Sequence, residues 1–135
     1  MLSELMITHA RQQTPQNFGK LITAFKVAQV GVHAVGVPSG VSEFKSTAEN
    51  PIEVGMTHHG GQGPLLLTYA DPEIFAQNHG QKFNATMTGE AALKAALFNP
   101  QCKGVLVNCA LAEISTFIDR KAAKHAVKRW WQFWR

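Results

Sequence analysis

Two adjacent histidines, His58 and His59, run directly into a glycine cluster, and they invite a metal-binding interpretation more than any other residues of the chain. Neighbouring residues of a strand point to opposite faces, so the two rings could not easily ligate one ion. The other four histidines show neither H-x-x-x-H nor H-E-x-x-H spacing. A composite site assembled by the fold is the alternative, but we expect no metal site and no cofactor.

The glycine cluster itself, Gly60-Gly61-Gln62-Gly63, lacks the features of the two common phosphate-binding loops. A P-loop ends in a lysine and a hydroxyl residue and opens a helix, whereas Pro64 begins an apolar strand. A dinucleotide-binding loop needs G-x-G-x-x-G between a strand and a helix, and only the first half is present. We therefore expect the tip of a β-hairpin. The alternative is a small-ligand or enzymatic pocket at this loop, lined by His58, His59, Gln62 and Asn108.

The nucleophilic residues lack the sequence partners that would activate them. Ser39 lies in GVPSG, which misses the G-x-S-x-G spacing of an esterase elbow. Cys102 and Cys109 form no CxxC motif, and without an export signal such thiols are typical of reduced core residues. The carboxylates show no spacing that would hold two of them on one face. We expect no catalytic residues, and we interpret the chain as a non-enzyme.

The positive charge of the chain belongs to its C-terminal end. Residues 119–135 contain six basic residues and one acidic residue, a net charge of +5. The remaining 118 residues carry seven basic and eight acidic residues, a net charge of −1. Binding to nucleic acid needs lysines and arginines spread over the contact face, so this near-neutral body predicts no specific nucleic-acid partner.

The same C-terminal segment, 119–135, is predicted to form an amphipathic helix. On a helical wheel the alanines, Val127 and most of the aromatic residues fall on one side, and the lysines fall on the other. Trp and Arg dominate the hot spots of protein interfaces. The candidate partner-binding residues are Arg129, Trp130, Trp131, Phe133 and Trp134.

Two other interpretations of this helix stay open. Its aromatic residues could close the edge of the hydrophobic core, since each buries about 150–250 Å². A helix that is basic on one face and aromatic on the other could also lie on a membrane surface. Membrane attachment is the weaker of these alternatives to protein binding, and a weak contact with single-stranded nucleic acid is weaker still.

Helical and strand-like patterns alternate along the chain and predict an α+β fold, a mixed α/β sandwich. We expect one domain over residues 1–135, with a central mixed sheet, a long hairpin and flanking helices. Asp71 and Asp119 each precede a helix and are predicted to cap it. The predicted helices are 2–13, 15–25, 72–80, 88–98 and 119–135, and the predicted strands are 27–37, 52–57, 65–69, 83–87, 104–108 and 114–118.

An ordered set of elements runs from Pro64 to about Ala126: an apolar strand, a short helix, a strand, a helix ending at Phe98, and the strand GVLVN at 104–108. This order, with a helix at 18–25 before a valine-rich strand, resembles the SseB (enhanced serine sensitivity) family. Cys109 replaces the proline that usually follows the asparagine, and Tyr69-Ala70 replaces the family's threonine-serine. The resemblance implies an α/β domain of the bacterial cytoplasm, at times beside secretion systems or toxins, with no established catalytic residues.

Together these patterns predict a non-catalytic bacterial domain that binds a partner protein, as an immunity or adaptor protein. The partner is a different protein or a second copy of the chain, contacted through surface loops and the aromatic C-terminal helix. The N-terminal residues Met1–Glu4 lack a basic region followed by an apolar one, so we expect no secretory signal and a cytoplasmic location.

Overall fold

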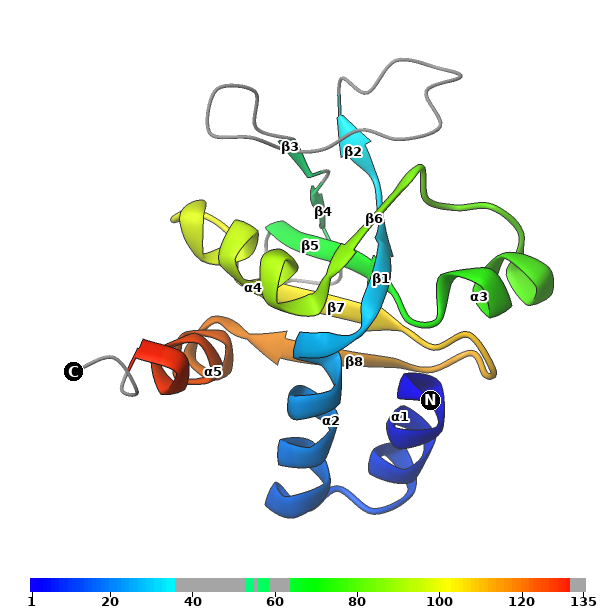
Figure 1. Cartoon of the computed structure of the whole chain (residues 1–135), viewed down its shortest axis with the longest axis horizontal. Coiled ribbons are helices and arrows are strands. Elements are labelled where there is room, and N and C mark those ends of the chain that lie inside the picture. The colour runs from blue at the N-terminus through cyan, green and yellow to red at the C-terminus, as the bar shows by residue number, and fades with distance from the viewer. Residues whose placement is uncertain (36–52, 55, 59–63, 132–135) are drawn as a thin grey trace.

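The computed structural model describes residues 1–35, 53–54, 56–58 and 64–131, which form an α+β fold around a mixed β-sheet (Figure 1). The sheet has the order β6-β1-β5-β7-β8, and β4 pairs with β5. β5 and β7 run parallel, and the other pairs in this sheet are antiparallel. The strands are β1 (Gln29–Val32), β4 (Met56–His58), β5 (Pro64–Tyr69), β6 (Ala85–Thr88), β7 (Gly104–Asn108) and β8 (Ser115–Asp119), with a separate antiparallel pair of β2 (Ala34–Val35) and β3 (Glu53–Val54).

Four helices bury their apolar sides against one face of the sheet: α1 (Leu2–Arg11), α2 (Pro15–Val27), α4 (Gly89–Phe98) and α5 (Arg120–Trp131). α3 (Pro72–His79) lies apart from them, beside the end of β5 (Figure 1). Strand residues alternate between the two faces. Leu66, Val105 and Ile118 therefore join the helical core, whereas Leu67 and Leu106 face the other side.

Local capping explains where three of the helices begin. The Oγ1 of Thr14 accepts from the N–H of Asn17, and the Oγ1 of Thr88 accepts from the N–H of Ala91. The Oδ1 of Asp119 accepts from Ala122 at 2.7 Å, which confirms the predicted cap of the last helix. Each contact satisfies an N–H group that the first helical turn leaves unpaired.

Asp71 does not use its side chain to cap the helix that follows it, so that prediction is wrong. Its backbone has φ 46° and ψ 68°, in the left-handed region, and the side chain forms no cap contact with α3. The Oδ2 instead accepts from the N–H of Ser3, in the first turn of α1, at 2.9 Å. The carboxylate therefore completes the N-terminus of a helix that lies 68 residues away in the sequence.

Arg120 performs the corresponding role at the C-terminus of α4. Its guanidinium donates to the carbonyls of Ala96, Leu97, Asn99 and Cys102, at distances between 2.9 and 3.3 Å. These oxygens lie at or just beyond the last turn of α4, where helix carbonyls lack internal partners. The sequence groups Arg120 with the basic surface residues, but this charge is committed to the fold.

Most predicted elements are confirmed, but several boundaries shift, and two predicted strands, 27–37 and 52–57, are each divided into two. The predicted strand 27–37 starts at Gln29, because α2 continues to Val27. The predicted strand 52–57 is divided between β3 and β4, and β6 starts at Ala85 rather than at residue 83. Phe83 instead places its ring over Gly31, where a Cβ atom would lie 2.6 Å from the ring. Residues 36–52, 55, 59–63 and 132–135 lie outside the described residues, and with them the predicted hairpin tip at the glycine cluster.

Candidate functional site

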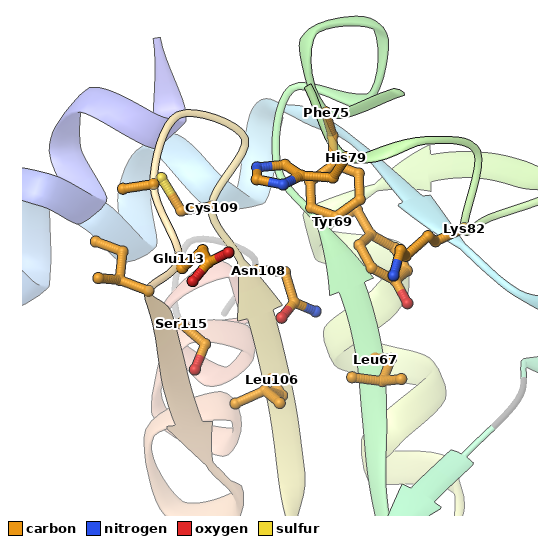
Figure 2. A pocket seen from close by; sticks show the side chains of 12 residues that line it. Leu67, Tyr69, Phe75, His79, Lys82, Leu106, Asn108, Cys109, Glu113 and Ser115 are labelled. Atoms are coloured by element: carbon orange, nitrogen blue, oxygen red, sulfur yellow. The ribbon is translucent and has the colours of Figure 1, made fainter. Parts of the chain in front are cut away.

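A cleft of about 460 Å³ lies at the carboxyl ends of β5 and β7, and we call it the polar cleft (Figure 2). Tyr69 and Asn108 pair with each other as the last residues of the two parallel strands. After β5 the chain passes through α3 to β6, whereas after β7 it turns to β8 on the other side. Two parallel neighbours whose connections leave in opposite directions create a crevice between their carboxyl ends. The polar side chains that line it are Tyr69, His79, Lys82, Asn108, Glu113 and Ser115.

Aromatic rings form one wall of the polar cleft. The ring of Phe75 lies 4.7 Å from that of Tyr69 and 4.8 Å from that of His79, measured between centroids. Phe83 lies 5.8 Å from Tyr69 and supports it from the side of β1. Leu67 and Leu106 add an apolar floor. Mutually packed rings limit side-chain freedom, so this wall is preorganised.

Three polar groups face this space. The hydroxyl of Tyr69 is protonated at neutral pH and can donate a hydrogen bond, and burial raises its pKa further above the usual 10.0. The Nδ2 of Asn108 donates to the carbonyl of Thr68 at 3.1 Å, which orients the amide between the strands. The Nε2 of His79 is shielded from solvent, and no residue in the described part of the chain hydrogen-bonds to it. Figure 2 shows its imidazole directed across the cleft toward the β7–β8 hairpin.

Opposite charges flank the cleft. Lys82 lies on the connection from α3 to β6, and Glu113 lies on the β7–β8 hairpin. Figure 2 places them on opposite sides, with Asn108 between them. Both residues are exposed, so their charges are available to a molecule that enters the cleft.

Ser3 joins the two flanks of the polar cleft through hydrogen bonds. Its N–H donates to Asp71, just before α3, and its Oγ accepts from the N–H of Ala110 at 3.0 Å, at the start of the hairpin. The Sγ of Cys109 also donates to the Ser3 carbonyl, at 3.7 Å. Ser3 is fully buried, so the N-terminus of α1 fixes the spacing between α3 and the hairpin.

A second cavity of about 710 Å³ lies between α2 and α5, and we call it the helical groove. Phe18, Ile22 and Ala122 supply apolar surface, and each is only half-buried. Lys121 and Lys124 are exposed on its α5 side. The Nζ of Lys26 donates to the carbonyl of Ala126 at 3.1 Å and thereby joins the two helices. The other lining residues are Pro15, Gly19, Thr23, Asp119 and His125.

The structure separates the residues of the candidate ligand loop. His58 pairs with Pro64 at the first residue of β5, and Asn108 pairs with Tyr69 at its last. These ends are about 16 Å apart, at roughly 3.3 Å per residue. Asn108 therefore lines the polar cleft and not a pocket at His58; His59 and Gln62 fall outside the described residues.

The candidate partner-binding residues continue from the helical groove. Arg129, Trp130 and Trp131 belong to the last turn of α5, for which the structure describes the backbone only. Phe133 and Trp134 lie beyond the described chain. In the part that is described, Ala123 and Ala126 are buried while Lys121, Lys124 and His125 are exposed, as the helical wheel predicts.

Sequence reasoning missed most of the polar cleft. Tyr69, His79, Lys82, Glu113 and Ser115 share no motif, and they come from two strands, one helix and two connecting segments. The usable signal is positional, since Tyr69 and Asn108 each end a buried strand. That signal becomes informative only once β5 and β7 are known to be parallel neighbours.

The described residues contain no group of three or more His, Cys, Asp or Glu side chains that could hold a metal ion. Cys102 and Cys109 are free thiols, and both are buried. No helix within those residues has the length and apolarity needed to cross a bilayer.

Comparisons with protein-family models, with curated proteins and with solved structures found no match for this chain. The resemblance to the SseB family therefore stays a prediction. The geometry of the two cavities carries the functional argument.

Proposed function

We propose that this chain is a non-catalytic protein-binding domain that holds a partner in the helical groove between α2 and α5. The observation that carries the proposal is the combination of an apolar floor with a basic wall on the α5 side. Phe18, Ile22 and Ala122 leave apolar surface open along the groove, and Lys121 and Lys124 stand exposed at its edge.

The charge of the two helices defines the chemistry of the partner. α2 and α5 carry seven lysines and arginines and no acidic residue. Asp119, just before α5, already accepts the N–H of Ala122, and Arg120 is committed to α4. A partner that is apolar on one side and acidic at its edges complements this surface. We infer an acidic amphipathic helix as the occupant, because such helices lay apolar i, i+3, i+4 and i+7 anchors into grooves.

The C-terminal end of α5 supplies further residues of the types that bind protein partners. Arg129, Trp130 and Trp131 follow the groove-lining residues within two turns of the helix. Trp and Arg are the residue types that most often dominate interface energetics. With Phe133 and Trp134 they would add an aromatic anchor beyond the groove. The resemblance to a bacterial family found beside toxins and secretion systems supports an adaptor or immunity role for such a domain.

The test is a displayed library of helix-forming peptides with randomised surface positions, sorted against the purified chain. We expect the selected peptides to combine apolar positions at helical spacing with several Asp or Glu residues. Their affinity should fall about tenfold or more in the double variant Lys121→Glu with Lys124→Glu, because both positions then repel the acidic residues of the peptide instead of attracting them. Trp130→Ala with Trp134→Ala should also weaken the binding of these peptides, because it removes the proposed aromatic anchor.

The matched control is Lys82→Glu with Lys103→Glu, which makes the same change of net charge at exposed lysines away from the groove. The control should bind the selected peptides like the unmodified chain. Equal losses of peptide affinity in both double variants would mean that only the net charge of the chain matters, and this would overturn the proposal. So would selected peptides without acidic residues, or preferential binding of a single-stranded oligonucleotide or of anionic vesicles that requires Lys121 and Lys124.

A further inference from the structure

We propose that the polar cleft is a second, separate site, which binds a small zwitterionic organic molecule with its anionic group toward Lys82 and its cationic group toward Glu113. This site shares no lining residue with the helical groove. It therefore adds a small-molecule ligand to a domain for which we propose a protein partner.

The position of the cleft supports ligand binding. The crevice between parallel strands whose connections diverge is where open α/β sheets place their ligands. β5 and β7 provide this arrangement, with Tyr69 and Asn108 at the rim. A volume of about 460 Å³ lies within the range of small-molecule pockets, about 300–1,000 Å³.

Two polar groups of the cleft, on His79 and Tyr69, can hydrogen-bond to a ligand. A shielded nitrogen without a partner is costly, and the Nε2 of His79 is in that state within the described structure. The hydroxyl of Tyr69, which lines the cleft, is neutral at physiological pH and is available as a donor. A ligand that hydrogen-bonds to these two groups removes an unfavourable feature of the empty protein.

The charges of the cleft select the ligand class. A simple anion attracted by Lys82 would be repelled by Glu113. A simple cation attracted by Glu113 would be repelled by Lys82. A molecule with both charges satisfies both residues, while Asn108 lies between them to contact its middle (Figure 2). The aromatic wall of Tyr69 and Phe75 shields one side of that contact from water.

The experiment uses amino-carboxylates of increasing length, from glycine through 4-aminobutyrate to 6-aminohexanoate. Binding is followed by two-dimensional ¹⁵N NMR on the full chain, with the side-chain amide of Asn108 as the local reporter. Acetate to hexanoate and the corresponding alkylamines serve as singly charged controls. We expect one length of zwitterion to bind best, and each singly charged analogue of that length to bind roughly fivefold more weakly, as for the loss of one exposed ion pair.

Two variants assign the charges. Lys82→Gln should remove the advantage of the zwitterion over the alkylamine, and Glu113→Gln should remove its advantage over the carboxylate. Their matched controls, Lys103→Gln and Glu73→Gln, alter exposed residues outside the cleft and should bind like the unmodified chain. Because all four side chains are exposed, we expect every variant to fold.

Three results would overturn this inference. One is the absence of shifts at Asn108 for every zwitterion up to solubility. Another is equal binding of the zwitterion and its singly charged analogues. The third is an affinity that does not change in Lys82→Gln and Glu113→Gln. The groove variant Lys121→Glu with Lys124→Glu should leave zwitterion binding intact, so failure here is distinguishable from failure of the protein-binding proposal.

Discussion

The two candidate sites rest on two charged residues that act in the same way with opposite signs. Asp71, beside the polar cleft, places a carboxylate at the N-terminus of α1; Arg120, beside the helical groove, places a guanidinium at the C-terminus of α4. Both arrangements complement the helix dipole and satisfy backbone groups that the helix leaves unpaired. They differ in the number of contacts, because Asp71 accepts one backbone N–H and Arg120 reaches four carbonyls.

This difference predicts how firmly each site is held. The four carbonyls that Arg120 joins come from α4 and from the turn before β7, so α5, α4 and the sheet meet at one side chain. Asp71 is supported by a second contact at the same place, since Ser3 also accepts from Ala110. Loss of Asp71 therefore leaves part of its junction intact, whereas loss of Arg120 leaves four carbonyls without their common donor.

Arg120→Ala should give the largest loss of stability, about 3 kcal/mol in the free energy of unfolding, because half-buried carbonyls lose charged donors. Urea unfolding followed by circular dichroism measures it. Binding in the helical groove should weaken with it, since α5 is no longer anchored to α4. Arg120→Lys keeps the charge but not the planar fork, and it should recover only part of the stability. A loss below about 1 kcal/mol for Arg120→Ala would contradict the junction described here.

Asp71→Ala should cost about 2 kcal/mol, from one charge-assisted hydrogen bond and from an alanine in a left-handed conformation. Two further variants separate these terms. Asp71→Gly relieves the backbone and loses the acceptor, whereas Asp71→Asn tolerates the conformation and keeps a neutral acceptor. We expect Asn to be the mildest change and Ala the most severe, again by urea unfolding. If Asp71→Ala proves as costly as Arg120→Ala, contact number does not distinguish the two junctions.

These junctions also show what sequence can and cannot predict. Periodicity locates the helices well, and the predicted cap at Asp119 is confirmed because its carboxylate acts on the turn that follows it. Asp71 precedes a proline and a glutamate in the same way, yet its carboxylate serves α1. The choice depends on which N–H group the fold brings close. A local motif carries no information about a partner 68 residues away.

The same limit applies to the sites. The basic character of 119–135 is visible in the sequence, so one wall of the helical groove could be predicted. The polar cleft depends on the parallel pairing of β5 and β7 and on divergent connections, which no residue pattern encodes. The sequence predicts a pocket that joins Asn108 with His58. In the structure Asn108 pairs with the last residue of β5, whereas His58 pairs with the first. Chemistry-bearing residues are read from sequence, and their grouping is a property of topology.

His79→Phe should raise stability by about 1 kcal/mol and weaken zwitterion binding, a combination that a purely structural histidine would not give. The change removes an unpartnered shielded nitrogen and keeps an aromatic ring against Phe75. Thermal unfolding gives the stability, and the NMR titration gives the affinity. Glu73→Gln, elsewhere on α3, is the control and should alter neither. A destabilised variant would mean that water or another group already satisfies the imidazole.

Tyr69→Phe should produce the smallest effect on the free energy of unfolding, within about 0.5 kcal/mol near pH 8, because it removes only a neutral hydroxyl group and keeps the ring. The pH dependence is more informative. Burial raises the pKa of Tyr69 in the folded state above 10.0, so the folded protein holds this proton more tightly than the unfolded chain. Stability is therefore retained below pH 10 and lost as the pH rises through the folded pKa, as ionisation favours the unfolded chain.

Phenylalanine has no such proton, so the stability of the unmodified chain relative to Tyr69→Phe should fall as the pH rises above about 10 in urea unfolding. Other groups that titrate in this range affect both proteins and cancel in the difference. A difference that stays constant would mean that Tyr69 is as well solvated as in the unfolded chain. The aromatic wall of the polar cleft would then be too open to shield a ligand from water.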